Sequence, residues 1–300
     1  MSGESDTSAK TPASVYFLLA FMVFVWSINF IVAKHALREF PSLLLGTLRF
    51  TLAGLMLVPY YVWERRRHRV PLWETGGLVK LLAVGLVGVG ANQLCFLLGL
   101  ARTSVSHAAI LFALTPMTVL LLSSAAGHER ITRSKVAGIL LAIAGVGLLQ
   151  LRGQDQRGAT LSGDLFILMA MLTFALFTVG GKSLRKDFDG VTINSFAYGG
   201  SALVLSPVTL WAAHRFDFST VSAGAWAALF YMALFPSIIA YLIYYHALRY
   251  LGATRLSTLA YLQPVIATAF AVTLLGETIT PSLMSGGALI LAGVFAAERS

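Results

Sequence analysis

Long apolar runs alternate with short polar stretches along almost the whole chain, and within each run apolar and polar positions do not alternate. A helix of about twenty apolar residues crosses the roughly 30 Å hydrocarbon core of a bilayer, whereas a membrane β-barrel strand would alternate residue by residue. The pattern therefore predicts an all-α integral membrane protein with ten transmembrane helices. The predicted spans cover residues 14–34, 42–63, 77–100, 104–126, 134–151, 162–184, 192–213, 223–248, 253–275 and 282–297.

The region around the fourth span occurs a second time. A shift of 148 residues places Leu100–Thr132 on Leu248–Thr280 without a gap. The matched pairs include Lys34 with Lys182, Pro116 with Pro264, Glu129 with Glu277, Gly138 with Gly286 and Gly145 with Gly293. The chain is therefore a tandem duplication. We predict a disordered cytoplasmic tail over 1–13, a first five-helix repeat over 14–151, an inter-repeat loop over 152–161 and a second five-helix repeat over 162–297.

The two repeats are expected to be inverted. Each has five spans, an odd number, so the second repeat must enter the membrane from the opposite side. Cytoplasmic loops of membrane proteins carry an excess of Lys and Arg. With the N-terminus inside, fifteen Lys and Arg residues fall in cytoplasmic segments and six outside, which leaves Arg49 within a span. We therefore expect a multi-pass protein of the cell (inner or plasma) membrane with both termini in the cytoplasm.

Composition supports this class and narrows the chemistry. Hydrophobic residues make up 57% of the chain and charged residues 12%, about half the charged fraction of a soluble domain. The net charge of +9 comes from basic residues at the ends of apolar runs, which we interpret as topology signals and not as a nucleic-acid surface. The single cysteine, Cys95, excludes a disulfide framework or a thiolate metal site. We expect no metal, no cofactor and no nucleic-acid partner.

Catalysis and proton coupling are both disfavoured by the sequence. An intramembrane enzyme would need paired buried carboxylates, His-Glu-x-x-His or Gly-x-Ser-x-Gly, and the sequence contains none of these. No Asp or Glu lies in the interior of a predicted span. A carboxylate there would mark an ion or proton pathway. If the chain moves a solute, uniport or exchange is therefore favoured over coupling through a carboxylate, with His107 and His246 as the titratable candidates.

Helical spacing brings aromatic and small polar side chains to one face of several spans. We predict that ten of them line a substrate site: Trp26, Asn29, Asn92, Phe96, His107, Phe174, Phe177, Tyr241, Tyr244 and Tyr261. Gln93 is a further polar candidate, while Gln263 lies on the opposite, alanine-rich face of its span and is expected to pack against a helix. Such a lining suits a small, mostly neutral or zwitterionic organic ligand better than a sugar phosphate, which would require several Lys or Arg residues.

A second group of residues is expected to bend or close the helices. Pro116 and Pro264 lie near the middle of spans four and nine, where each releases a carbonyl and acts either as a hinge or as a tolerated kink. Glu129 and Glu277 end the same spans at opposite membrane surfaces, where they organise turns or close gates. Arg49 lies about 10 Å into span two. Its guanidinium either extends back to the interface or holds an anionic ligand group or a freed carbonyl.

Several segments resemble the EamA-like members of the drug/metabolite transporter superfamily. The residues that carry the resemblance are VWSINFIVAK at 25–34, the LRF around Arg49, LGLARTSVSHAAILFALTPM followed by GHERIT, ALRYLGATRLSTLAYLQPV and LLGETIT. The resemblance implies a ten-helix fold with a central cavity lined mainly by spans one, three, four, six, eight and nine.

Inverted repeats and this resemblance together predict a secondary transporter, with export the commoner assignment, that moves small organic metabolites such as amino acids by alternating access. A lipid-handling flippase on the same scaffold is the alternative. We expect a small-molecule substrate, contact with membrane lipid, and a monomer or homodimer.

Overall fold

The computed structural model describes residues 12–68, 77–125, 132–152, 160–184, 187–247, 250–251, 256 and 261–298. Within these ranges the chain is helical and contains no strand. The helices are α1 (Ala13–Ala36), α2 (Ser42–Arg67), α3 (Leu78–Gly85), the π-helix η1 (Leu86–Ala91), α4 (Asn92–Leu100), α5 (Val105–Phe112), α6 (Thr115–Ala125), α7 (Arg133–Arg152), α8 (Leu161–Leu184), α9 (Gly190–His214), the 3-10 turn η3 (Phe218–Thr220), α10 (Ala223–Leu234), the π-helix η4 (Phe235–Ile239), α11 (Ala240–Ala247), α13 (Leu262–Leu275) and α14 (Pro281–Glu298).

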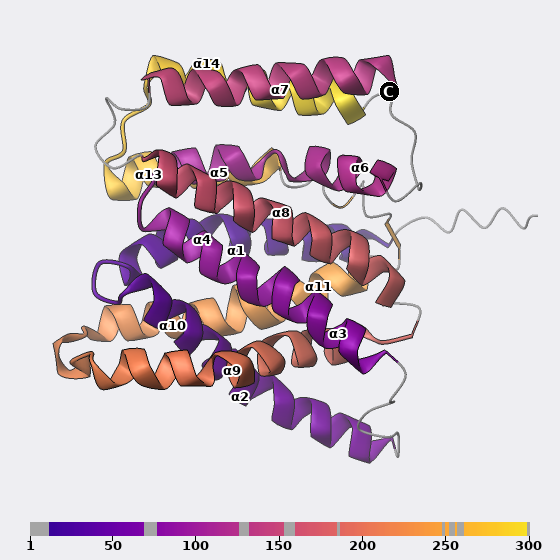
Figure 1. Ribbon diagram of the computed structural model, residues 1–300, viewed down its shortest axis with the longest axis vertical. Coiled ribbons are helices and arrows are strands. Elements are labelled where there is room, and N and C mark those ends of the chain that lie inside the picture. The colour runs from indigo at the N-terminus through magenta and orange to yellow at the C-terminus, as the bar shows by residue number, and fades with distance from the viewer. Residues whose placement is uncertain are drawn as a thin grey trace, which may run out of the picture.

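These elements follow the predicted order of spans. In the described part of the chain, seven continuous helical stretches are long and apolar enough to cross a membrane, and two shorter apolar helices cover Leu262–Leu275 and Pro281–Ala297. Spans three, four and eight are each built from consecutive helical segments and not from one uniform helix. The helices run roughly side by side in layers, with α7 and α14 paired along one edge of the bundle (Figure 1).

The α7–α14 contact displays the symmetry of the duplication. A Cβ on Gly138 would lie 2.3 Å from the Gly293 carbonyl oxygen, and one on Gly145 would lie 2.7 Å from the Gly286 carbonyl oxygen. The sequence shift matches Gly138 with Gly286 and Gly145 with Gly293, so the repeat relation exchanges the two contacts. Because residue number rises along one helix as it falls along the other, the pair is antiparallel. Close approach of small residues is a common mode of helix association in membranes.

The 148-residue shift also maps other contacts between helices onto one another. Helix α1 packs on α13 of the second repeat, and its equivalent α8 packs on α6 of the first. Helices α2 and α9, which are equivalents of each other, also pack together. Most helices therefore contact a helix of the other repeat, and the space between the repeats is the centre of the molecule.

Two π-helices interrupt spans three and eight at equivalent positions. The first covers Leu86–Ala91 and the second Phe235–Ile239, and the sequence shift places the first on residues 234–239. In the second, the Ser237 hydroxyl donates to the Met232 carbonyl at 2.7 Å. The apolar patterns of these spans give no sign of the wider turns. Such turns often occur at functional sites because they re-aim the side chains around them.

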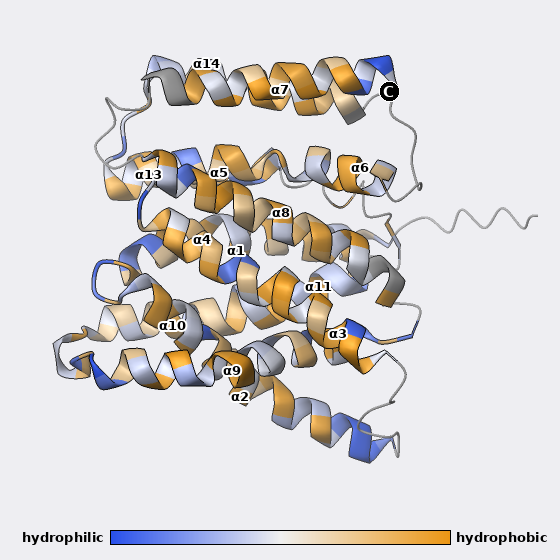
Figure 2. Ribbon diagram, viewed as in Figure 1, coloured by the Kyte–Doolittle hydropathy of each residue, from blue (hydrophilic) through white to orange (hydrophobic). Residues whose placement is uncertain are grey.

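Charged side chains lie at both ends of the bundle. Arg65–Arg67 at the end of α2 lie at the same end of the bundle as the C-terminus, and their hydrophilic colour is plain in Figure 2. The loop after α1 lies at the opposite end. There the Glu39 carboxylate accepts hydrogen bonds from the backbone N–H and hydroxyl of Ser222, the N-cap residue of α10, at 2.6 and 2.7 Å. These hydrogen bonds hold the pKa of Glu39 below its usual value of 4.5.

Candidate substrate cavity

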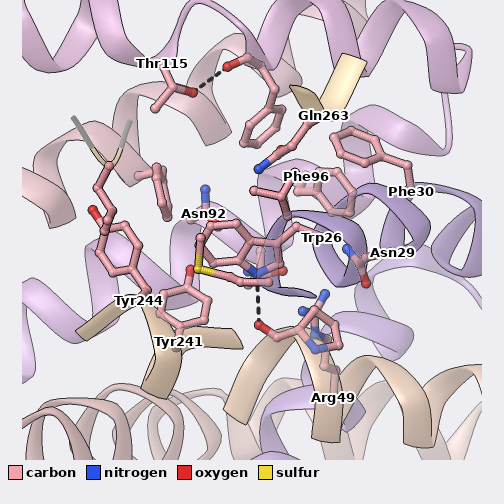
Figure 3. A pocket seen from close by; sticks show the side chains of 17 residues that line it. Trp26, Asn29, Phe30, Arg49, Asn92, Phe96, Thr115, Tyr241, Tyr244 and Gln263 are labelled. Carbon is pink, nitrogen blue, oxygen red and sulfur yellow. Dashed lines mark hydrogen bonds between the residues drawn. The ribbon is translucent and has the colours of Figure 1, made fainter. Parts of the chain in front are cut away.

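A cavity of about 80 Å³ lies between the two repeats. One water needs roughly 10–15 Å³ of such space, so the cavity holds several waters or a small organic group. Spans one, two, three, four, six, eight and nine contribute to its wall. The lining residues are Met22, Val23, Trp26, Asn29, Phe30, Arg49, Asn92, Gln93, Phe96, Phe112, Thr115, Phe174, Pro236, Tyr241, Tyr244, Leu256 and Gln263 (Figure 3).

Aromatic rings from both repeats meet at Trp26. Its ring centroid lies 5.7 Å from that of Tyr241, 5.9 Å from Tyr244 and 6.1 Å from Phe174. The Trp26 indole N–H donates to the Pro236 carbonyl of η4 at 3.3 Å, which fixes the ring. Aromatic pairs at these distances and edge-to-face angles are favourable contacts. The π-helix therefore positions the central aromatic residue of the cavity.

Amide side chains supply most of the polar lining. The Asn92 side-chain amide donates to the Ala170 carbonyl of α8 at 2.6 Å, so this group joins spans three and six. The Asn29 side-chain oxygen is buried and has no hydrogen-bond partner among the described residues. Gln93 and Gln263 are each 8% exposed and also line the cavity. Asn29 thus presents a free acceptor to an occupant.

Arg49 is the charged residue among the described lining residues and is 0% exposed. Its Nε donates to the Ser237 hydroxyl of η4 at 2.8 Å. Its Nη1 and Nη2 atoms have no hydrogen-bond partner in the described part of the chain. In Figure 3 the guanidinium points toward the side of the cavity where Asn29 and Trp26 lie. The side chain therefore faces the cavity and does not extend back to the membrane interface.

The cavity includes seven of the ten residues predicted to line it, and three lie elsewhere. The seven are Trp26, Asn29, Asn92, Phe96, Phe174, Tyr241 and Tyr244. Phe177 packs behind the wall, with its ring centroid 5.9 Å from Tyr241, because Gly88 opposite leaves room for it. Tyr261, half-buried at the periphery of the apolar core, also lies outside the lining. The expectation that Gln263 only packs against a helix is wrong, since its side chain lines the cavity.

His107 belongs to a separate buried cluster near the start of α5. Its Nδ1 lies 3.2 Å from one Asp164 carboxylate oxygen, and the Thr103 hydroxyl donates to the other at 2.5 Å. All three side chains are at most 2% exposed. Asp164, the third residue of predicted span six, was missed as a buried group because its sequence position suggests the interface. This cluster joins α8 of the second repeat to α5 and the preceding loop of the first.

Pro116 lies at a break between two helices. Helix α5 ends at Phe112 and α6 begins at Thr115, so the proline occupies the first turn of α6. A missing N–H costs little there. The Thr115 hydroxyl donates to the Phe112 carbonyl at 2.6 Å and satisfies the oxygen that the proline frees. Pro264 likewise falls in the first turn of α13, which begins at Leu262.

Glu277 binds the N-terminus of α5. Its carboxylate oxygens accept hydrogen bonds from the Val105 N–H at 2.7 Å, the Ser106 N–H at 3.0 Å and the Ser106 hydroxyl at 2.7 Å. Nearby, the Lys34 ammonium donates to the Leu100 and Thr103 carbonyls, both at 2.7 Å. A carboxylate at a helix N-terminus also stabilises the helix dipole. These contacts hold the end of α13 and the end of α1 against the entrance of span four. The equivalent residue Glu129 lies outside the described residues.

Inverted five-helix repeats around a central cavity are an arrangement found in membrane transporters. The family model of the EamA-like transporter family matches residues 13–151 and 161–297, and the chain belongs to this family. It is therefore a multi-pass membrane transporter and not an enzyme.

Relatives match almost the whole chain. An uncharacterized transporter of Archaeoglobus fulgidus is 26% identical over 95% of this chain and 98% of its own length. A probable amino-acid metabolite efflux pump of Salmonella typhimurium is 28% identical, covering 93% of each chain. A probable terminal-alkyne amino-acid exporter of Streptantibioticus cattleyicolor is 26% identical over 94% of this chain and 92% of its own. A solved crystal structure shares the fold with a TM-score of 0.66 and 20% identity, over 96% of this chain and 99% of that one.

Proposed function

We propose that this protein exports small organic metabolites of the amino-acid type by alternating access. The observation that carries the proposal is the central cavity, which both repeats line with aromatic rings and a few amide groups. Two of the relatives named above are a probable amino-acid metabolite efflux pump and a probable terminal-alkyne amino-acid exporter, which supports the same substrate class. Inverted repeats can exchange conformations, so that a ligand held between them is exposed to each side in turn.

The contacts at the α5 entrance support a gate at one side of this cavity. Glu277 and Asp164, both from the second repeat, bind the first repeat at the start of span four. Opening on that side requires these inter-repeat contacts to break while the α7–α14 contact stays intact. The break before Pro116 lies at the wall of the cavity, between the lining residues Phe112 and Thr115. A change in helix direction there would move α5 and the entrance and leave α6 in place.

Counterflow in proteoliposomes tests the function. Vesicles loaded with one amino acid or related metabolite at high concentration should take up trace labelled compound, and Trp26→Ala should abolish the uptake because it removes the centre of the aromatic cluster. Trp63→Ala is the matched control, since Trp63 is 54% exposed and lies outside the cavity. Both variants should elute as monodisperse protein. A folded wild-type protein that exchanges no compound across a broad metabolite panel would refute the proposal.

A further inference from the structure

Arg49 carries a positive charge that the described protein does not neutralise. The side chain is 0% exposed and comes from the interior of α2. Charged side chains inside a membrane protein are costly unless paired, and they mark sites that bind a charged partner. The described residues that line the cavity include no Asp or Glu. The ionisable groups around Arg49 are the phenols of Tyr198, Tyr231 and Tyr241, and Tyr198 lies close enough to interact with the guanidinium. All three phenols are neutral at pH 7 because an ordinary tyrosine titrates near 10, so none of them neutralises the charge.

One edge of the guanidinium is fixed and the other is free. The Nε atom donates to the Ser237 hydroxyl, and that hydroxyl in turn donates to the Met232 carbonyl. The serine therefore must offer a lone pair to Arg49, and the π-helix holds it in that orientation. The Nη1 and Nη2 atoms, in contrast, are buried without a hydrogen-bond partner among the described residues. Buried donors of a charged group almost always have partners.

The position is specific to the first repeat. Its equivalent in the second repeat is Ala197, which is 0% exposed. A Cβ on Gly85 would lie 2.7 Å from the Ala197 Cα, so that site has no room for a long side chain. The repeat symmetry and the packing of the scaffold therefore do not require an arginine at position 49. A negatively charged ligand in the cavity would give the Arg49 side chain a role.

We propose that Arg49 binds the carboxylate of the transported molecule. The N–H groups of Nη1 and Nη2 match the two oxygens of a carboxylate, which is the geometry of a bidentate pair. The aromatic rings at Trp26 then hold the remainder of the molecule, including an ammonium group over a ring face. This inference rests on the proposed function and narrows its substrate class to carboxylates. It excludes free amines and amino-acid amides as good substrates.

Ligand pairs that differ only in the carboxylate provide the test. Purified protein is screened by thermal shift against L-amino acids and the corresponding L-amino-acid amides, and the same pairs are used in counterflow. Removing one partner of a buried charge pair weakens binding by about 30-fold or more. Wild-type protein should therefore prefer each acid to its amide by at least this factor. Arg49→Gln should reduce binding of the acid to the level of the amide and leave the amide unchanged. Arg49→Lys should bind the acid with intermediate affinity, because it keeps the positive charge and loses the paired N–H groups of the guanidinium.

The controls separate a ligand contact from a structural one. Arg215→Gln makes the same chemical change at an exposed arginine stacked on Trp211 and should leave the acid preference intact. An Arg49→Gln protein that is folded and loses acid and amide equally, or that keeps the acid preference, would overturn the assignment. Acid binding that depends on Arg49 without counterflow would support the assignment and refute the transport function. Binding of neither ligand by folded wild-type protein would refute both.

Discussion

The hydrogen bonds of Glu277 lead to a prediction about the population of open states. Its carboxylate accepts three hydrogen bonds from Val105 and Ser106 and caps α5. Glu277→Gln keeps one oxygen but replaces the other with an NH₂ group, which cannot accept from a backbone N–H. At least one charge-assisted hydrogen bond is lost, at about 1.5–3 kcal/mol, together with roughly 0.3–1 kcal/mol of helix-dipole stabilisation. Because Glu277 is half-exposed, we take the lower end, about 2 kcal/mol.

If these bonds exist only in the closed state, the open population rises by roughly 30-fold, since about 1.4 kcal/mol changes an equilibrium tenfold. The assay is the rate at which a membrane-impermeant maleimide labels one cysteine inside the cavity of intact cells. Cys95 is the single cysteine of the chain, so Cys95→Ala gives a clean background. Thr115→Cys places the reporter on a lining residue that is 2% exposed. We expect Glu277→Gln to speed labelling by about 30-fold.

Asp217→Asn is the matched control for this experiment, because Asp217 makes the same acid-to-amide change at an exposed N-cap of the turn η3, away from the cavity. It should leave the labelling rate unchanged. If the Glu277 end faces the cytoplasm instead, intact cells will show no labelling and inverted vesicles will show the increase. A labelling rate within twofold of the parent from both sides, in folded protein, would mean that Glu277 caps α5 in every state and does not gate the cavity.

Three further predictions concern the scaffold. Gly138→Val should destabilise the fold by about 1–3 kcal/mol through overpacking. Gly147→Val on the same helix should have little effect, because a Cβ on Gly147 meets nothing within 4 Å. Thermal unfolding checks both variants, and equal unfolding midpoints would contradict the α7–α14 contact. Asp164→Ala should lower the unfolding midpoint more than Asp164→Asn, since it leaves the buried Thr103 hydroxyl and His107 Nδ1 without a partner, at about 1–3 kcal/mol each. Equal stability of the two variants would count against the cluster. The Glu39 carboxylate has a lowered pKa, so its contact with α10 should be intact above pH 4.5 and lost as the pH falls through that lowered pKa. In an infrared titration, the carboxylate signal that disappears in Glu39→Gln should titrate below pH 4.5, and titration of that signal at or above 4.5 would oppose the hydrogen-bonded geometry.

The sequence predicted the helices and their order well because length and hydropathy are properties of each segment alone. A run of about twenty apolar residues has few options in a bilayer. The 148-residue shift went further and paired Gly138 with Gly286, and the structure shows these glycines at contacts that the shift exchanges. Repetition in a sequence thus carried three-dimensional information that a single span does not contain.

The cavity was harder to predict, for reasons that are local to each residue. Phe177 lies on the same helix as the lining residue Phe174, yet it packs behind the wall because Gly88 leaves room for its ring there. Gln263 lies on an alanine-rich face, which the sequence pattern marks as a packing face, but in the structure its side chain lines the cavity. Asp164 follows its predicted span start by only two residues, and burial there depends on Thr103 and His107 from another part of the chain.

The symmetry of the repeats and the chemistry of the cavity have different purposes. Under the proposed alternating access, contacts that the 148-residue shift exchanges, such as those between α7 and α14, would let each repeat adopt the conformation of the other. A lining that was equally symmetric would hold a ligand in two equivalent orientations. At matching positions, however, the first repeat has Arg49 where the second has Ala197, and Asn29 where it has Phe177. The positive charge and the free amide acceptor of the lining therefore both belong to the first repeat, while aromatic rings line the cavity from both repeats. A carboxylate-bearing molecule would keep a single orientation as the scaffold exchanges states, because its charged end stays with the first repeat on both sides of the transition.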